Sequence, residues 1–485
     1  MSRKKRELAS RIDKRKKKLR KVKNQELFLS LVNFVLPEGA LFLEGEFHGN
    51  IKWVPEQLAA QALIWSWQDT KKVTDAFEKT LEICEQLGLT EIAKTYTAFM
   101  NAISRYRAIL NDRLRLRHQE LAEETGGRHF RTKQWVLIAF DGSRATAPRS
   151  VANEKAFCAP NHGKGNRAKY GKKKSKGLRR KRIKAQKTAA PEPQVWITMM
   201  WHIALRLPWT WRLGPSNSCE RWHVQEMLEQ EKFPKGTLFC GDAGFVGYPL
   251  WAAILATGEN FLVRVGGNVQ LLSNDADILE EGGGIVLCWP KEMRNKCDPI
   301  RLRLVQVEVG KTKMWLLTSI LDERKLTEAE MIKIYKMRWG IEVEFRGLKQ
   351  TIDKHKLRCK NSDRLLAELD WSIRAMAIAE LIALKQQMPQ EKEDRKYDTK
   401  DRSLAKTLRA LRRCMRNLDK PITPTSGVLY DLAQALVDRY QNTTDKRARF
   451  RPRNSDIKPL GNPKVEKITP EIRKQIEKQS ARIAA

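Results

Sequence analysis

Two short apolar segments, each followed by an aspartate, place the strongest constraint on the fold of this chain. Residues 135–140 lead into Asp141, and residues 236–241 lead into Asp242. Apolar runs of this length, bounded by glycine, are typical of buried strands. A single aspartate after a strand is more often a turn residue or a helix cap than a functional group. As a pair, the two segments predict an α/β fold with two carboxylates at the ends of strands.

A third acidic residue lies on a predicted helix. Residues 330–352 have helical periodicity and contain Tyr335, Arg338, Glu342 and Lys349. An α-helix with these spacings places all four side chains within about 60° of arc. Mixed charges of this kind usually belong to a solvated amphipathic helix. The alternative is a carboxylate flanked by cations, which suits a metal ion and a nucleic-acid phosphate.

The charge of the chain indicates a polyanionic partner. Its 485 residues include 93 Lys+Arg against 57 Asp+Glu, a net charge of +36, and nucleic acid is the partner that best fits this excess. A membrane surface is the other candidate, but no apolar run approaches the roughly 20 residues that span a bilayer. The basic N-terminus lacks a secretory cleavage pattern. The eight cysteines include no Cys-x2-Cys pair, which indicates a reduced cytoplasmic protein without structural zinc.

The composition changes several times along the chain. A basic loop at residues 163–187 has too little apolar area to fold alone. It either holds phosphates by its positive charge or is an unconstrained insertion. The helical region at residues 25–130 is either a DNA-binding domain or a support domain. The predicted organisation is a basic arm (1–24), a helical DNA-binding domain (25–130), the first part of an α/β core (131–254) with a disordered basic loop (163–187), a β-rich insertion (255–325), the last part of the core (326–387), a helical C-terminal region (388–445) and a disordered basic tail (446–485).

The helix at 330–352 matches the signature Tyr-x2-Arg-x3-Glu-x6-Lys at every spacing. It resembles the helix with the catalytic glutamate in DDE transposases of bacterial insertion sequences. The segments 140–143 and 241–247 resemble those around the two catalytic aspartates of the same family. That family carries a β-rich insertion between its second aspartate and its glutamate, where this chain also has strand patterns. The resemblance covers residues 135–352 and implies a ribonuclease H-like core with a β-rich insertion, flanked by helical N- and C-terminal regions.

The resemblance assigns the metal-binding and catalytic roles to Asp141, Asp242 and Glu342. Three carboxylates can hold two divalent cations about 4 Å apart. Oxygen ligands suit Mg²⁺, for which Mn²⁺ can substitute. Glu344 is a competing carboxylate, but it lies about 160° around the helix from Glu342.

The resemblance also assigns residues that bind DNA. Tyr335, Arg338 and Lys349 are expected to hold the DNA end, particularly its 5′ phosphate. Trp315 is expected to stack on a flipped base during hairpin formation, with a core strand tryptophan as the equal alternative. Arg264 is a weaker candidate for a DNA contact.

The function implied is a DNA transposase that binds the terminal inverted repeats of its insertion sequence. It would cleave the ends by metal-dependent hydrolysis and transesterification, through a hairpin, and join the 3′ ends to target DNA. The implied partners are element ends, target DNA and a second copy of the chain in the synaptic complex, with no membrane, in a cytoplasmic, nucleoid-associated setting. The alternatives are a transposase-derived DNA-binding protein without catalysis and a ribonuclease H-class nuclease.

Overall fold

The computed structural model describes residues 22–42, 44–158, 192–294, 296–309, 312–388, 398–423, 425–437 and 460–484. The expected basic loop at 163–187 and nearly all of the expected basic arm at 1–24 lie outside these residues.

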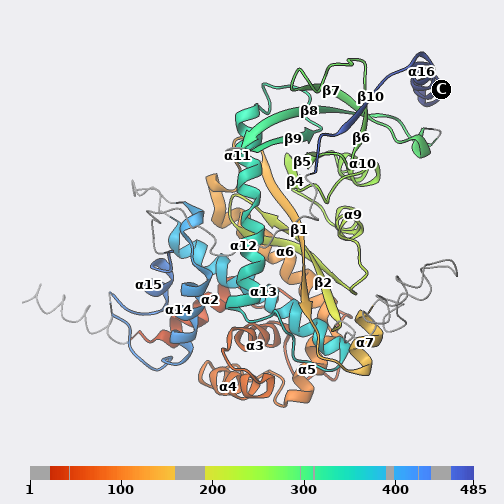
Figure 1. The fold of residues 1–485 in the computed structure, drawn as a ribbon. Helices are drawn as coiled ribbons and strands as arrows, with labels where there is room; N and C mark the ends of the chain where they lie inside the picture. The colour runs from red at the N-terminus through yellow and green to blue at the C-terminus, as the bar shows by residue number, and fades with distance from the viewer. Residues whose placement is uncertain are drawn as a thin grey trace, which may run out of the picture.

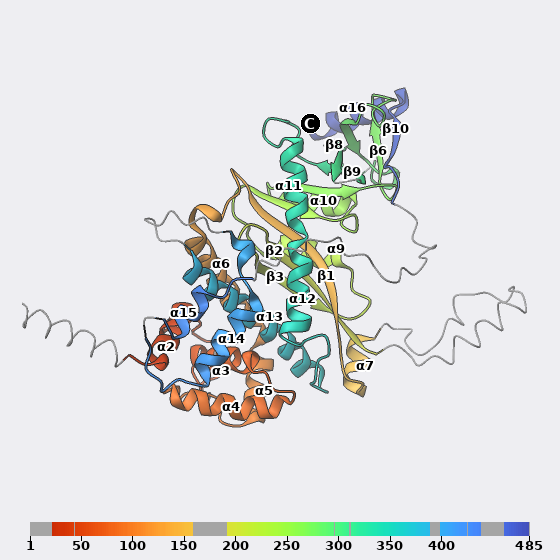
Figure 2. The same ribbon diagram turned by 60° about the vertical axis from the view of Figure 1, so that its left-hand side comes forward.

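A single ten-stranded sheet runs through the molecule in the order β10-β6-β7-β8-β9-β5-β4-β1-β2-β3 (Figures 1 and 2). Its first three strands in the chain are antiparallel neighbours, and β4 and β5 run parallel to β1. The strands are β1 (Val136–Thr146), β2 (Gln194–His202), β3 (Leu207–Gly214), β4 (Thr237–Gly241), β5 (Asn260–Val265), β6 (Gln270–Ser273), β7 (Gly283–Cys288), β8 (Ile300–Val309), β9 (Thr312–Thr318) and β10 (Lys464–Lys467).

Strand β1 separates two hydrophobic cores. Leu137 and Ala139 belong to one core, whereas Val136, Ile138 and Phe140 belong to the other. This alternation follows from the two-residue period of a strand that is covered on both faces. The continuous apolar sequence before Asp141 therefore reflects burial on both sides of the sheet.

Helices cover the two faces. The first face is covered by α11 (Glu328–Arg338), α12 (Gly340–Arg346) and α13 (Ser362–Gln387), whose apolar side chains share a core with Leu137. The second face is covered by α9 (Glu220–Gln230) and α10 (Tyr248–Ala256), together with part of α6 (Arg107–Gly126). Figure 1 shows α11 and α12 running along the sheet, with α9 and α10 beyond it.

The helical regions before and after the sheet share one core. Helix α13 is buried along most of its length, and Trp67 donates a hydrogen bond from its indole nitrogen to the Ala375 carbonyl at 2.9 Å. Figures 1 and 2 show the helices before β1 and the two helices that follow α13 gathered around α13 at one end of the molecule, whereas the C-terminal helix lies at the opposite end beside β10. The remaining helices are α2 (Asn24–Val35), α3 (Pro55–Trp67), α4 (Val73–Gln86), α5 (Tyr96–Arg105), η1 (Gly127–His129), α7 (Val151–Phe157), η3 (Lys291–Met293), η5 (Thr399–Asp401), α14 (Leu404–Met415), α15 (Val428–Ala433) and α16 (Pro470–Ala484).

The strands after Asp242 extend the core sheet. The predicted boundary at residue 255 falls just before β5, yet β5 pairs with β4 on one side and with β9 on the other. Strands β8, β7 and β6 continue outward from β9. The β-rich segment is therefore continuous with the core sheet through backbone hydrogen bonds.

The expectation of a disordered C-terminal tail is wrong for residues 460–484. Strand β10 pairs in parallel with β6, and α16 follows it. The sequence has no long apolar run here, which is why composition indicated disorder. An edge strand needs few buried side chains, because its backbone hydrogen bonds to the sheet supply much of its attachment.

The helix expected at 330–352 is interrupted. Helix α11 ends at Arg338, α12 begins at Gly340, and residues Gly347–Thr351 (η4) form a π-helical turn. A Cβ at Gly340 would overlap the Trp201 ring of β2, so only glycine allows the helix to lie this close to the sheet.

Candidate active site

Asp141 and Asp242 lie on neighbouring parallel strands. The pairing of β1 with β4 ends at Ala139 and Cys240, and the two aspartates stand two residues beyond that pair. The expectation that β1 ends at Asp141 is wrong, because the strand continues to Thr146 and Asp141 pairs with Met199 of β2. Asp141 nevertheless lies beyond the end of β4, so β1 has no paired strand beside Asp141 on that side.

Each aspartate is oriented by a backbone amide. Gly142 donates its N–H to Asp141 Oδ1 at 2.8 Å, and Gly244 donates its N–H to Asp242 Oδ1 at 2.8 Å. These bonds occupy one oxygen of each carboxylate and fix its direction. Among the described residues, the second oxygen of each carboxylate accepts no hydrogen bond, and it can bind another ligand.

Glu342 approaches the aspartates from α12. Thr327 caps the start of α11 with its side chain, and Glu330 completes a capping box, so the helix begins at a defined residue. Alternation along β1 directs Asp141 to the same face as Ala139, which is the face that α12 covers. The Glu342 side chain is 33% exposed, which leaves its carboxylate open to a ligand.

Arg338 is the cation of this cluster. The residue is only 6% exposed, and its Nη2 lies 3.6 Å from Glu342 Oε1. Its Nε and Nη1 atoms are buried and have no hydrogen-bond partner within the described part of the chain. A buried guanidinium with unused donors is costly unless an anion completes its hydrogen bonds.

The surroundings of Asp141 raise its pKa. Burial raises the pKa of Asp141 to about 6, the hydrogen bond from Gly142 lowers it, Asp242 and Glu342 raise it, and Arg338 lowers it. Asp242, Glu342 and Arg338 thus all lie close enough to Asp141 to act on its charge. Arg338 lowers the pKa of Asp141 by less than burial and the neighbouring carboxylates raise it.

Glu344, the competing carboxylate, faces the opposite way. It is buried, and burial together with Glu380 raises its pKa well above the usual range, while Arg402 and Arg206 lower it. Arg402 also approaches Glu380, with Nε 3.8 Å from Oε1. Glu344 thus belongs to a buried network that attaches α12 to the neighbouring helices.

Tyr335 and Lys349 have different relations to this cluster. The Arg338 guanidinium lies 5.3 Å from the centroid of the Tyr335 ring, so these two side chains are in contact. Lys349 lies on the π-helical turn, where the 100° rotation per residue assumed for an α-helix no longer applies. Burial lowers the pKa of Lys349.

Trp315 and Arg264 lie on paired strands β9 and β5. Trp315 is 3% exposed, packs in a hydrophobic core, and donates its indole N–H to Asn462 Oδ1 at 3.0 Å. The structure therefore places Trp315 as a core tryptophan covered by the C-terminal segment. Arg264 is half-buried on β5. It lies next to Trp315 in the sheet, because the following residue, Val265, pairs with Trp315.

Sequence reasoning missed Glu220, the first residue of α9. Its carboxylate lies against Gly142, where a Cβ would overlap it. Burial, Asp141 and Asp242 raise the pKa of Glu220 to about 7, and Arg144 lowers it. No motif marks this glutamate; its position after β3 is the only signal.

The donor set fits a divalent cation in its chemistry. Its carboxylate oxygens are the ligands that Mg²⁺ prefers, and burial together with neighbouring carboxylates raises the pKa of Asp141 and of Glu220. Across the described residues, however, no three His, Cys, Asp or Glu side chains are already spaced to hold a metal ion. Mutual repulsion between carboxylates favours separated side chains, and a cation would reverse that preference.

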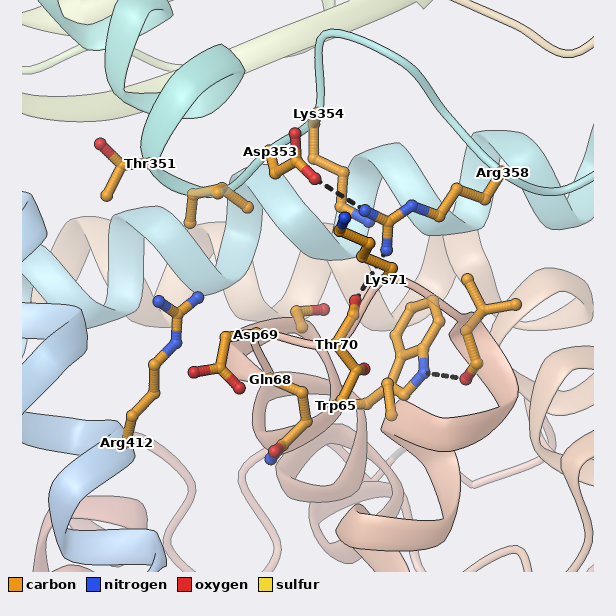
Figure 3. Close-up of a pocket in the computed structure, with 14 residues that line it drawn as sticks. Trp65, Gln68, Asp69, Thr70, Lys71, Thr351, Asp353, Lys354, Arg358 and Arg412 are labelled. Atoms are coloured by element: carbon orange, nitrogen blue, oxygen red, sulfur yellow. Dashed lines mark hydrogen bonds and ion pairs between the residues drawn. The ribbon is translucent and has the colours of Figure 1, made fainter.

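A separate polar pocket lies where α3, α14 and the segment after η4 meet (Figure 3). Lys354 donates to Glu368 at 2.8 Å, and Arg358 donates to Asp353 at 2.7 Å and to the Thr70 carbonyl at 2.8 Å. These cations are therefore used in holding the segments together, and we assign no ligand to the pocket.

Residues 204–378 match the family model described as a transposase DDE domain. The matched range contains Asp242, Glu342 and the whole signature helix, and Asp141 precedes it. The match supports a transposase, the class of protein that the signature indicates.

Among solved structures, the chain is similar to the piggyBac transposase in its synaptic complex with hairpin DNA, determined by cryo-EM. The identity is 13%, the TM-score is 0.40, and the likeness covers 88% of each chain. A likeness this remote does not define the fold or the function. The search of curated proteins gave no match. Among the described residues, no helix is long and apolar enough to cross a membrane.

Proposed function

We propose that this chain is a DDE transposase that cuts DNA at the ends of its own element and joins the 3′ ends to target DNA. The observation that carries the proposal is that Asp141 and Asp242 follow the last pair of the parallel strands β1 and β4, on the sheet that α11 and α12 cover with the buried Arg338 and its neighbour Glu342. The match to a transposase DDE domain supports it.

The strand order supports a ribonuclease H-like core. Strands β3, β2, β1, β4 and β5 are consecutive neighbours, with the first three antiparallel and the last two parallel to β1. In such a core the first strand is central and carries a carboxylate, as β1 carries Asp141. Strands β6 to β9 are then the insertion.

The carboxylates define where the reaction takes place. Asp141, Asp242 and Glu342 would hold Mg²⁺ or Mn²⁺ in a two-metal site, which when bound activates the attacking oxygen and stabilises the leaving oxygen. The amides of Gly142 and Gly244 hold two of these carboxylates in place before substrate arrives.

The cations of the signature helix bind the DNA strand. Arg338 has two unused donor atoms for phosphate oxygens, and burial makes such contacts stronger than in water. Tyr335 supports the guanidinium with its ring and can donate its hydroxyl to phosphate. Lys349 would supply a further positive charge from the π-helical turn.

The hairpin step rests on the family resemblance alone. Stacking of a flipped base on Trp315 requires Asn462 to release its hydrogen bond and the covering segment to move. Arg264 would then contact DNA beside the exposed ring. We further propose that two copies of the chain join the element ends in a synaptic complex, in a cytoplasmic, nucleoid-associated setting.

The test is a cleavage assay on labelled DNA that carries the inverted repeats flanking the gene. Purified wild-type protein should cut the ends in Mg²⁺, with Glu342→Gln inactive in cleavage but still able to bind the ends. Glu328→Gln is the matched control, because Glu328 is an exposed residue at the start of α11. End binding without cleavage by the wild type would indicate a DNA-binding derivative, and end-independent cutting would indicate a ribonuclease H-class nuclease.

A further inference from the structure

Basic side chains extend away from the candidate active site along α12. Arg346 lies four residues after Glu342, one helical turn further along, so the two side chains lie on the same side of the helix. Arg346 is exposed, and Lys349 follows it on the π-helical turn. Positive charge therefore continues beyond the carboxylates at the C-terminal end of α12.

The segment after η4 continues this positive charge along β1. Thr146, the last residue of β1, forms a backbone bridge with Lys356. Ser150 donates its hydroxyl to the Lys360 carbonyl at 2.6 Å, so Lys360 lies beside the start of α7. Figure 2 shows β1 running past α12 toward α7. The exposed side chains of Arg346, Lys356 and Lys360 thus form a basic row from α12 to the far end of β1.

The acidic side chains beside the basic row are offset by other groups. Asp353 Oδ2 lies 2.7 Å from Arg358 Nη2, and Glu154 Oε1 lies 3.1 Å from Arg149 Nη1. Asp363 lies in the first turn of α13, where the helix dipole favours its negative charge. The three side chains of the basic row, by contrast, make no hydrogen bond or ion pair with any described residue.

The charge and the position of the basic row indicate its ligand. Three exposed cations without acidic partners attract a polyanion. The row starts one turn beyond Glu342, beside which the buried Arg338 has unused donors that suit a phosphate oxygen. A ligand with phosphates at regular intervals can contact Arg338 and the basic row together.

We propose that the basic row binds the phosphates of duplex DNA that extends from the candidate active site along β1. The inference rests on the proposed function for the entry of DNA at the carboxylates. Lys356 lies level with Thr146, five residues along β1 from Asp141, which is about 17 Å at about 3.3 Å per residue. Duplex DNA rises about 3.4 Å per base pair, so Lys356 meets a phosphate about five base pairs from the bond that is cut.

The experiment measures the binding of labelled duplex DNA to the full-length protein by fluorescence anisotropy, in EDTA and at several salt concentrations. The logarithm of the association constant falls with the logarithm of the salt concentration, with a slope of about 0.9 for each phosphate contact. The triple variant Arg346→Gln, Lys356→Gln and Lys360→Gln should therefore reduce that slope by about 2 to 3. Between about 50 and 200 mM salt, the wild type should lose roughly 40-fold more affinity than this variant.

The matched control is the triple variant Lys79→Gln, Lys232→Gln and Lys291→Gln. It removes the same charge from exposed positions on α4, after α9 and in η3, and its slope should stay close to that of the wild type. Equal slopes in the wild type and the basic-row variant, or the same reduction in the control, would overturn the proposal. The measurement needs neither metal nor cleavage, so a wild type that binds DNA through the basic row without cutting it would count against the proposed function alone.

Discussion

The buried ion pair between Lys354 and Glu368 offers a sharp test of how the region around the active site is held. Glu368 is fully buried on α13 and accepts hydrogen bonds from Lys354 Nζ at 2.8 Å, Arg358 N at 2.9 Å and Cys359 N at 3.0 Å. Burial raises the pKa of Glu368, whereas Lys354 and the two backbone amides lower it. The lowering effects are larger together, so the pKa lies below its usual range. The carboxylate is therefore ionised, and both of its oxygens accept hydrogen bonds.

The expected cost of Glu368→Gln follows from these contacts. Glutamine has the same shape as glutamate but only one acceptor oxygen. If that oxygen keeps the hydrogen bonds from the two backbone amides, the side-chain NH₂ group must face Lys354. The lysine is then buried without an anion, and breaking a buried pair in this way costs about 3–5 kcal/mol. Urea unfolding followed by tryptophan fluorescence should show that loss in the free energy of unfolding.

The loss should extend to the active site. The segment after η4 also pairs with the end of β1: Thr146 donates to the His355 carbonyl at 2.9 Å, and Leu357 donates to the Thr146 carbonyl at 2.8 Å. Glu368 anchors this segment, so its loss should loosen the strand that carries Asp141 and lower DNA cleavage.

Two further variants test whether the ion pair itself causes the loss of stability. Lys354→Met in the Glu368→Gln background should recover part of the stability, because it removes the unpaired cation. Glu78→Gln, at an exposed position on α4, should change stability by less than about 0.5 kcal/mol. A loss below about 1 kcal/mol in Glu368→Gln, or no recovery in the double variant, would show that the pair is not the anchor.

Three other outcomes are expected. Gly340→Ala should lower stability by about 1–3 kcal/mol, measured by urea unfolding, because its Cβ would overlap Trp201; a neutral effect would mean that the helix can shift without cost. Arg338→Lys should reduce cleavage and end binding in an electrophoretic shift assay, because lysine cannot make the bidentate contact; unchanged binding would remove Arg338 from the phosphate site. In metal-free protein, the free energy of unfolding should fall as pH rises from 3.8 through about 6, because the pKa of Asp141 is raised in the folded state and its ionisation there is disfavoured. Glu220 and Glu344, whose pKa values are also raised, contribute to the same fall, so Asp141→Asn should show a smaller fall than the wild type. Identical pH profiles of the two proteins would refute the assignment.

Much of the site could be predicted from local patterns. The apolar runs before Asp141 and Asp242 indicated buried strands because a strand covered on both faces has no polar alternation. The fixed spacing of the signature helix singled out Glu342 over Glu344, and the structure places Glu344 in a buried network on the opposite side. Those inferences depend on one segment at a time.

Other features depend on contacts between distant segments. Glu220 has no motif, and only the packing of α9 against Gly142 brings it to the carboxylates. The burial of Trp315 depends on Asn462, which lies 147 residues away in the chain. The order of the C-terminal segment likewise depends on the free edge of β6.

By itself, the sequence determined the α/β class, the two aspartates, the signature helix and the excess of positive charge. These depend on residue type, burial pattern and helical period, which are local properties. The tertiary structure decided that β1 continues beyond Asp141, that a π-helical turn carries Lys349, and that Glu220 of α9 lies against Gly142 on the far face of the sheet. Side chains from separate elements meet only after the sheet has paired, and no local pattern records that pairing.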